Sequence, residues 1–334
     1  MIACSQDPAS RVDALFAAYT GTALPGAAVL VIRDGEVLLA RGYGMANLEE
    51  AEPVTPATGF RLASVTKQFT AMCVLMLADR GQLSLDETMV DVFPDFPEYG
   101  RLITMRNLLQ HTSGLIDYEP FVPEDSPDQV TDRGVLDIMR QQTGTYFVPG
   151  SEYRYSNSAY AVLSQVVETR SGKSFATFLT ENIFEPLGMD NTVAYQKGIS
   201  TVANRAYGYA IAGDAIEFSD QSPWSAVLGD GGIYSSINDL YRWDQALYTE
   251  ALIPAALFGE ALEPNLEDYG YGWRIDEWRG HRRMHHDGST SGFRNFVIRF
   301  PDERLSVFVL TNRREPDVQP LAEAVAALYA DHTS

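Results

Sequence analysis

The segment that decides the fold reads Leu62-Ala63-Ser64-Val65-Thr66-Lys67, and the apolar run Phe69–Ala78 follows it. This run has no polar face at the helical period of about 3.6 residues, which predicts a helix buried on all sides. We expect Arg80 and Gly81 to end this helix, the first as a cation in the last turn and the second as the glycine after it.

Ser64 falls at or near the N-cap of the predicted helix, and Lys67 falls in its first turn, so the hydroxyl and the amine lie on one face. A lysine there opposes the helix dipole by about 0.3–1 kcal/mol, and the apolar helix behind it removes water from the amine. Both effects lower the pKa of an amine, which suits it to accept a proton from a serine. Ser64 is therefore the candidate nucleophile. Read alone, the pattern also fits an N-cap serine followed by a surface lysine.

Composition excludes several classes of function. The 334 residues are 45% hydrophobic, enough for one large domain or two smaller domains that share a core. The net charge of −20, from 25 basic and 45 acidic side chains, repels nucleic acids and anionic membrane surfaces. The apolar run after Ser64 has about ten residues, whereas a membrane span needs roughly 20. We expect neither a nucleic-acid partner nor a membrane span.

The chain has two cysteines, Cys4 and Cys73. Because Cys73 belongs to the buried helix, we expect no disulfide between them. The opening Met1-Ile2-Ala3-Cys4-Ser5 resembles the end of a bacterial lipoprotein signal, in which a small residue precedes the lipidated cysteine. Two locations stay open: export to the periplasm or the medium, with a lipid anchor at Cys4, and the cytoplasm.

Strands are predicted near both ends of the chain. Ala27–Ile32 and Val37–Arg41 flank an Asp-Gly pair and predict an antiparallel hairpin. Phe293–Phe300 and Leu305–Thr311 read as two further strands. The middle of the chain is helical and interrupted by prolines, and Glu119–Asp132 within it is expected to be an exposed acidic loop. This order predicts one sheet built from both ends of the chain, with a helical domain inserted.

A second polar cluster contains Tyr155 and Asn157, on a turn just before a predicted helix. The two side chains point the same way if the backbone is extended. A phenol beside an ammonium has its pKa lowered and can exchange protons with a serine hydroxyl. The amide of Asn157 can orient a lysine or a substrate carbonyl. Read alone, the pair is more often an interfacial tyrosine and a turn asparagine.

A third cluster runs from His285 to Phe293, with the sequence His-His-Asp-Gly-Ser-Thr-Ser-Gly-Phe. Its glycines and serines allow a close approach of the backbone to a ligand, although each histidine also fits a structural role. Adjacent histidines diverge on a strand and no His-Glu-x-x-His helix is present, so we expect no metal and no cofactor. His111 is expected to be structural and bonded within its own turn.

In order and spacing, Ser64-Val65-Thr66-Lys67, Tyr155-Ser156-Asn157 and His286-Asp287-Gly288 resemble the three active-site motifs of penicillin-recognising serine hydrolases. The resemblance is to the group of class C β-lactamases, DD-peptidases, D-aminopeptidases and family VIII esterases. Four other segments are also typical of this group, and they spread the resemblance over most of the chain: Gly81–Asp86, Leu108–Leu115, Pro186–Met189 and Gly231–Ser235.

The resemblance implies a β-lactamase/transpeptidase-like α/β fold, with an antiparallel sheet flanked by helices. The sheet domain would comprise residues 7–63 and 201–334, the mainly helical domain residues 64–200, and the active site would lie at their interface. Ser64 would attack a carbonyl, and Lys67 and Tyr155 would share the general-base work before Tyr155 protonates the leaving group. The remaining residues implied in substrate binding or the oxyanion hole are Asn157, His286, Asp287, Gly288 and Ser289, with the backbone N–H groups of Ser64 and Ser289 as oxyanion donors.

The third motif departs from the β-lactamase form, which has Lys-Thr-Gly there. The His-x-Gly form resembles DD-peptidases, D-aminopeptidases and some esterases. If Asp287 faces the cleft it repels a substrate carboxylate, and the missing lysine removes a counter-ion. Both changes disfavour penicillins and a free C-terminal D-alanine. If strand alternation turns the Asp287 side chain away from the cleft, it does not repel a substrate carboxylate. Arg294 could also restore the positive charge that the missing lysine removes.

We expect a serine hydrolase that forms an acyl-enzyme on Ser64. The first hypothesis is an esterase or amidase for small ester or amide substrates, uncharged or amine-bearing, with weak or no β-lactamase activity. The second is a D-amino-acid peptidase, either a D-aminopeptidase whose Asp287 recognises the amine or a DD-carboxypeptidase. A β-lactamase is the third. A non-catalytic penicillin-binding or sensory protein, acylated once, is the alternative from another class.

Overall fold

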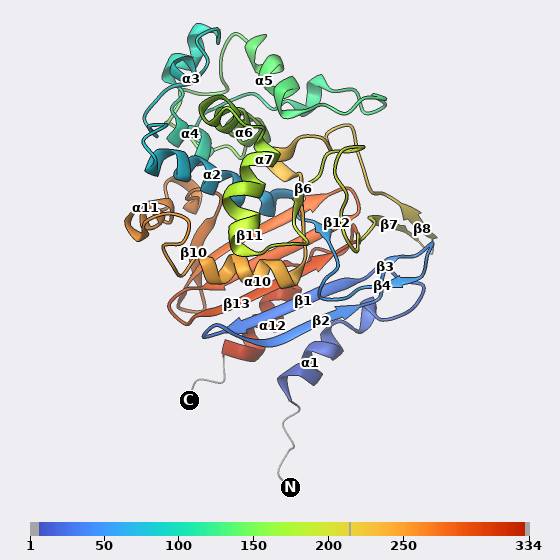
Figure 1. Cartoon of the computed structure of the whole chain (residues 1–334). Helices are drawn as coiled ribbons and strands as arrows, with labels where there is room; N and C mark the ends of the chain where they lie inside the picture. The colour runs from blue at the N-terminus through green and yellow to red at the C-terminus, as the bar shows by residue number, and fades with distance from the viewer. Residues whose placement is uncertain (1–6, 214, 331–334) are drawn as a thin grey trace.

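The computed structural model describes residues 7–213 and 215–330 and has a six-stranded antiparallel sheet at its centre (Figure 1). The strand β1, near the start of the chain, pairs with β13, near its end, from Ala27 opposite Thr311 to Arg33 opposite Leu305. Both ends of the chain therefore build one sheet, which confirms this part of the prediction. The strands in spatial order are β10 (Arg274–Trp278), β11 (His281–Thr290), β12 (Phe293–Phe300), β13 (Leu305–Thr311), β1 (Ala27–Arg33) and β2 (Glu36–Tyr43).

Helices cover both faces of the central strands. Val29 and Val31 pack toward the terminal helices α1 (Pro8–Leu15) and α12 (Gln319–Ala330), whereas Leu30 belongs to the core on the opposite face. That second core includes Trp243 of α10 (Ile237–Ala246). Because both faces are covered, β1 and β13 are buried along nearly their whole length, and their residues are mostly apolar rather than alternating.

The predicted hairpin is confirmed, and its turn follows from Asp34 and Gly35, which both have positive φ angles of +51° and +82°. The strands β12 and β13 match the predicted ranges. Neither β10 nor β11 was predicted, because the third motif was expected only to lead into the strand Phe293–Phe300, whereas its residues up to Thr290 lie within β11. These two strands carry many charged residues, and ion pairs such as Arg283 with Asp276 compensate that charge.

The helix α2 (Lys67–Asp79) is buried from Lys67 to Leu77, as the apolar run predicts. It ends at Arg80, and Gly81 follows with φ +65°, as expected. Ser64 is not the N-cap, because a 3-10 turn over residues 63–66 precedes the helix and Thr66 occupies that position.

Most of the other helices form a layer on one side of the sheet, and α3 to α6 gather at the top of Figure 1. The layer contains α3 (Met89–Val92), α4 (Met105–Leu109), α5 (Asp132–Arg140), α6 (Asn157–Ser171), α7 (Phe175–Leu179) and α8 (Glu185–Leu187). Two short helices follow later in the chain, α9 (Leu228–Gly231) and α11 (Ala255–Ala261). The short strands are β3 (Met45–Asn47), β4 (Glu52–Pro53), β5 (Phe60–Arg61), β6 (Val193–Ala194), β7 (Tyr209–Ala212), β8 (Ala215–Phe218) and β9 (Ile233–Ser235).

We propose the same two domains as the sequence suggested, residues 7–63 with 201–334 and residues 64–200, because all six main strands come from the first and α2 to α8 from the second. Within residues 7–213 and 215–330, no helix combines the length and the apolar character needed to cross a bilayer. The lipid anchor expected at Cys4 lies outside the described residues.

Candidate active site

Ser64 is presented by the 3-10 turn that leads from β5 into α2. Ala63 just before it has φ +50°, a left-handed conformation that costs an alanine about 1 kcal/mol or more. The Leu62 N–H donates to Ile233 O at 2.8 Å, and Asn295 Nδ2 donates to Leu62 O at 3.1 Å. These two hydrogen bonds hold the strained backbone before Ser64 in place. Ser64 itself is half-buried.

Lys67 is fully buried and its amine touches the candidate nucleophile. Nζ lies 2.9 Å from Ser64 Oγ, 2.9 Å from Asn157 Oδ1 and 2.9 Å from the backbone oxygen of Asp230. An ammonium has three N–H donors, so each has one acceptor here. The geometry fixes the amine against the serine hydroxyl, as the spacing of the two residues predicts.

Burial lowers the pKa of Lys67 to about 8, because water cannot solvate its charged form. The carboxylates of Asp230, Asp287 and Glu119 act in the opposite direction, but burial prevails. The direction agrees with the sequence argument. Near neutral pH the amine can therefore both release and accept a proton.

Tyr155 lies next to this amine, with Lys67 Nζ 4.8 Å from the centroid of its ring. Burial raises the pKa of Tyr155 well above its ordinary value, and the Ser64 hydroxyl only partly offsets this. The sequence argument expected a lowered pKa from the neighbouring ammonium, and this expectation was wrong because desolvation of the phenolate outweighs the charge. Tyr155 therefore carries its proton at neutral pH.

Asn157, the first residue of α6, connects Lys67 to an acidic side chain. Its Oδ1 accepts from Lys67, and its Nδ2 donates to Glu119 Oε1 at 2.8 Å. The two contacts also fix the orientation of the amide, because only its oxygen can accept from an ammonium. Glu119 was expected only as part of an exposed loop.

His111 supports the second motif from behind. It is fully buried, and its Nδ1 accepts from the backbone N–H of Ser156 at 3.1 Å. Ser156 caps α6, because its hydroxyl accepts from the Ala159 N–H. His111 is thus structural, but its partner is 45 residues away rather than within its own turn.

His286 is fully buried beside Tyr155, with ring centroids 6.2 Å apart. Its Nδ1 lies 2.7 Å from the backbone oxygen of Asp287, and its Nε2 lies 2.9 Å from the hydroxyl of Tyr269. A carbonyl only accepts, so Nδ1 carries the proton and Nε2 accepts from Tyr269. Burial lowers the pKa of His286 to about 4, so this side chain is neutral and supplies no positive charge near pH 7.

The next residues of β11 alternate in direction. A Cβ on Gly288 would stand 2.2 Å from Leu62 O, so only glycine allows β11 to approach the nucleophile segment this closely. Asp287 is exposed and lines a separate depression with Arg294 and Asp317. Partial desolvation by the surrounding protein opposes the charge of Asp287, but His286 and Arg274 nevertheless lower its pKa. Asp287 does not line the cavity at Ser64, so the argument from repulsion of a substrate carboxylate lapses.

An open cavity of about 190 Å³ lies in front of the nucleophile. Three of the expected site residues line it, Ser64, Asn157 and Ser289. Lys67, Tyr155 and His286 lie behind this wall, where they contact the lining residues or each other. That the Ser64 and Ser289 N–H groups form the oxyanion hole stays a prediction.

Five charged or aromatic lining residues were not predicted: Arg61, Tyr118, Glu119, Trp224 and Asp230. Asp230 Oδ2 accepts from the Tyr118 hydroxyl at 3.0 Å, and burial raises the pKa of Asp230 to about 7 although Lys67 acts against it. A signal for Asp230 was present in Gly229-Asp230-Gly231-Gly232, because an acid among glycines points to a backbone that another segment approaches closely. Glu119 and Arg61 gave no such signal.

Comparisons with known proteins support the resemblance. The chain is 33% identical over 308 residues to a penicillin-binding protein of Bacillus subtilis, covering 86% of this chain and 68% of that protein. It is 32% identical over 335 residues to a D-aminopeptidase of Gluconobacter oxydans, covering 95% of this chain and 61% of the enzyme. The chain thus spans only about two thirds of the length of these relatives.

The fold also matches a solved structure. The penicillin-binding protein homologue from Pyrococcus abyssi superposes with a TM-score of 0.85 at 26% identity, over 97% of this chain and 77% of that one. This match confirms the β-lactamase/transpeptidase-like fold. The Beta-lactamase family model matches residues 12–331, so the expectation of a β-lactamase-related hydrolase is confirmed at the level of the family. The chain belongs to the Beta-lactamase family.

Proposed function

We propose that this chain is a serine hydrolase that forms an acyl-enzyme on Ser64, with Lys67 as the first proton acceptor. The observation that carries the proposal is the 2.9 Å contact between Lys67 Nζ and Ser64 Oγ inside a buried site. Because the pKa of Lys67 is lowered to about 8, roughly a tenth of the amine is neutral at pH 7 and able to accept a proton. A serine hydroxyl without such a partner is inert.

The proposed reaction has two halves. Ser64 Oγ bonds to the substrate carbonyl carbon while its proton moves to Lys67 Nζ, and the N–H groups of Ser64 and Ser289 stabilise the oxyanion. Tyr155 then donates its proton to the leaving group as the carbon–leaving-group bond breaks, and Lys67 reprotonates the phenol. Its raised pKa keeps Tyr155 protonated at neutral pH, so the phenol holds a proton that it can give once the leaving group becomes basic. Water releases the acyl group by the reverse proton path.

We propose esters or amides of small acyl groups, with a protonated amine near the reacting carbonyl, as substrates. The cavity at Ser64 is lined by the carboxyl groups of Glu119 and Asp230, which attract a cation. The D-aminopeptidase relative favours the amide of an amine-bearing acyl group. A β-lactam is disfavoured because His286 is neutral where β-lactamases of the group carry a lysine.

A substrate panel tests this function. Wild type and Ser64→Ala are compared on p-nitrophenyl butyrate, D-Ala-p-nitroanilide and nitrocefin, with mass spectrometry for an adduct on Ser64. We expect turnover of the ester and the anilide by wild type, an adduct on Ser64, and loss of both activities in Ser64→Ala. Equal turnover by Ser64→Ala would refute the mechanism. A stable adduct without turnover would instead establish the non-catalytic, sensory reading.

A matched variant tests the amine subsite. Glu119→Gln keeps an oxygen that can accept from Asn157 but removes the charge. We expect kcat/KM for D-Ala-p-nitroanilide to fall about tenfold, while p-nitrophenyl butyrate, which has no amine, changes less than threefold. An equal loss on both substrates would mean that Glu119 acts by holding Asn157 and not by binding the amine.

We further propose export with a lipid on Cys4, which the Ala3-Cys4-Ser5 pattern supports. Membrane fractionation of wild type and Cys4→Ser tests it. Wild type should sediment with membranes and Cys4→Ser should not, whereas the same soluble distribution for both would refute the anchor.

A further inference from the structure

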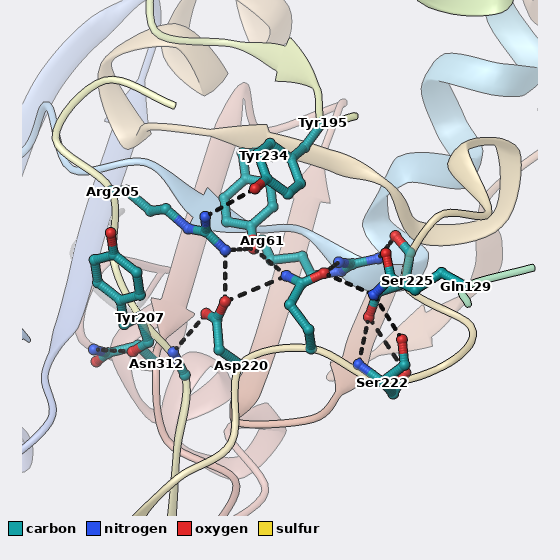
Figure 2. A network of polar contacts seen from close by, with 12 residues as sticks. Arg61, Gln129, Tyr195, Arg205, Tyr207, Asp220, Ser222, Ser225, Tyr234 and Asn312 are labelled. Carbon is teal, nitrogen blue, oxygen red and sulfur yellow. Dashed lines mark hydrogen bonds and ion pairs between the residues drawn. The ribbon is translucent and has the colours of Figure 1, made fainter. Parts of the chain in front are cut away.

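Two arginines lie in one polar network beside the cavity, and only one of them is neutralised. Figure 2 shows Arg205 contacting Asp220 and Arg61 reaching toward Ser225. Arg205 Nη2 is 2.5 Å from Asp220 Oδ2, a partly buried ion pair. Arg61 is 3% exposed and, within residues 7–213 and 215–330, makes no ion pair. A buried charge without a counter-charge is costly, and in this chain acidic side chains are nearly twice as frequent as basic ones.

The donors of Arg61 are also only partly satisfied. Its Nη2 donates to Ser225 O at 2.9 Å, and its Nη1 has only a long contact of 3.5 Å with Gln221 Oε1. The Nε is buried without a partner among the described residues. Gln221 also donates to Asp220 at 3.3 Å, so a neutral amide stands between the Arg61 guanidinium and that carboxylate. The guanidinium, with its five N–H donors, is left short of acceptors.

Although Arg61 is almost fully buried, part of it faces the reaction site. It lines the same cavity as Ser64, together with Ser222 and Trp224. The indole Nε1 of Trp224 is likewise buried without a partner among residues 7–213 and 215–330. This side of the cavity, defined by Arg61, Ser222 and Trp224 and called the donor wall below, carries hydrogen-bond donors in excess of acceptors.

The carboxyl groups that line the cavity accept hydrogen bonds from other residues and not from the Arg61 guanidinium, within the described residues. Glu119 accepts from Asn157, and Asp230 accepts from Tyr118. Neither makes an ion pair or hydrogen bond with Arg61 in the described part of the chain. No carboxyl group of the cavity lining therefore satisfies the donors of Arg61 in the described part of the chain, although Arg61 itself lines this cavity.

We propose that the donor wall is a subsite for a carboxylate carried by the acyl part of the substrate, with Arg61 as its specificity-determining residue. The proposal rests on the proposed attack by Ser64, because the acyl group must reach the nucleophile and the donor wall together. A carboxylate would supply the counter-charge that Arg61 lacks and acceptors for the free N–H groups. Together with the acidic side chain of Glu119 in the same cavity, a carboxylate subsite at Arg61 predicts an acyl group that carries both an amine and a carboxylate, such as an acidic amino acid.

An isosteric pair of esters tests the subsite without involving the amine. Mono-p-nitrophenyl glutarate carries a terminal carboxylate, and p-nitrophenyl 4-carbamoylbutanoate replaces it by a neutral amide of the same size. We expect wild type to prefer the carboxylate by at least about tenfold in kcat/KM, mainly through KM. In Arg61→Gln the ratio should fall to about one, and Arg61→Lys should restore part of it. A wild-type ratio near one would overturn the proposal.

Two further variants separate recognition from support of the fold. Arg205→Gln removes a buried guanidinium from the same network but lies outside the cavity at Ser64, so the ratio should keep its wild-type value. If Arg205→Gln lowers the ratio as much as Arg61→Gln does, Arg61 acts only through the network and the proposal fails. Trp224→Phe deletes one donor and keeps an aromatic ring, so the ratio should fall about threefold. If Arg61→Gln does not fold, Trp224→Phe alone tests the proposal. An unchanged kcat/KM ratio of the two esters in Trp224→Phe would then refute the donor wall as a carboxylate subsite.

A binding experiment distinguishes failure of this subsite from failure of the proposed hydrolase function. If wild type hydrolyses neither ester, the hydrolase proposal fails, and binding is measured instead. Glutarate is titrated into Ser64→Ala and followed by tryptophan fluorescence, with the uncharged diamide glutaramide as the control. Saturable binding of glutarate alone, lost in Ser64→Ala with Arg61→Gln, supports the subsite. Equal binding of both compounds, or of neither, overturns it.

Discussion

Lys67 and Asn157 are joined by a 2.9 Å hydrogen bond that connects the first turn of α2 to the first residue of α6. A neutral amide in this place orients the amine without stabilising its charged form as a carboxylate would. Asn157→Asp would put a negative charge against Lys67, which raises the pKa of an amine.

We therefore predict that Asn157→Asp moves the acid limb of the pH dependence of kcat/KM upward by about 1–2 pH units, measured with p-nitrophenyl butyrate. The activity at pH 7 falls accordingly. Asn157→Ser, which adds no charge, is the control and should lose rate without the upward shift. An Asn157→Asp profile whose limb stays in place or moves down would contradict this role of the amide.

The wild-type enzyme should itself show the lowered pKa of Lys67. If the neutral amine accepts the proton from Ser64, kcat/KM rises with pH and levels off above about 8. Lys67→Met should lower kcat by about 10²–10⁴ and abolish this limb. A profile that is flat from pH 6 to pH 9 would argue against Lys67 as the base.

Gly288 tests how closely β11 must approach the nucleophile. A methyl group at this position would meet Leu62 O at 2.2 Å and displace the segment before Ser64. We predict that Gly288→Ala lowers kcat/KM at least tenfold, because a displacement of about 1 Å in a site can cost that much or more. Gly259→Ala in α11, where a Cβ would meet nothing within 4 Å, is the matched control and should change the activity less than twofold.

The buried carboxyl group of Asp132 lies behind the cavity and supports its lining. Its oxygens accept from the N–H groups of Leu228 and Gly229 in α9, next to Asp230. Burial raises the pKa of Asp132 to about 6 in spite of these bonds. Since this pKa lies above the unfolded value of 3.8, the native state binds the proton more tightly, and its stability falls as pH rises from about 4 to 6.

Asp132→Asn cannot ionise and keeps only one of the two acceptors. We predict that it is less stable than wild type at pH 4, and that this difference shrinks by on the order of 2 kcal/mol by pH 7. Urea denaturation at several pH values measures both proteins. A difference that stays constant, or that grows with pH, would mean that Asp132 is charged at low pH in the native protein.

The sequence predicted those parts of the site that lie in short, local patterns. Ser64 and Lys67 are three residues apart, so one helical turn is enough to bring them together, and the strands Phe293–Phe300 and Leu305–Thr311 are rich in apolar and aromatic residues. The glycine at position 288 also belongs to a recognisable motif, although its contact with Leu62 is visible only in three dimensions.

What was missed depends on long-range contacts. Glu119 reaches Asn157, 38 residues away, and nothing in its acidic neighbourhood separates it from the exposed side chains that follow. Arg61 lies 164 residues from Ser225, to which it donates, so its environment has no local signature. The pKa of Tyr155 was predicted in the wrong direction because a neighbouring charge can be inferred from a motif, whereas the extent of burial cannot.

The pairing of β1 with β13 has a consequence for how the chain is made. Ala27 meets Thr311 across the sheet, so a nascent chain must keep β1 paired on its β2 side alone until the residues of β13 have left the ribosome. During biosynthesis the central sheet is therefore completed only when β13 has emerged, and loss of residues 305–311 would remove the strand that joins β10–β12 to β1 and β2.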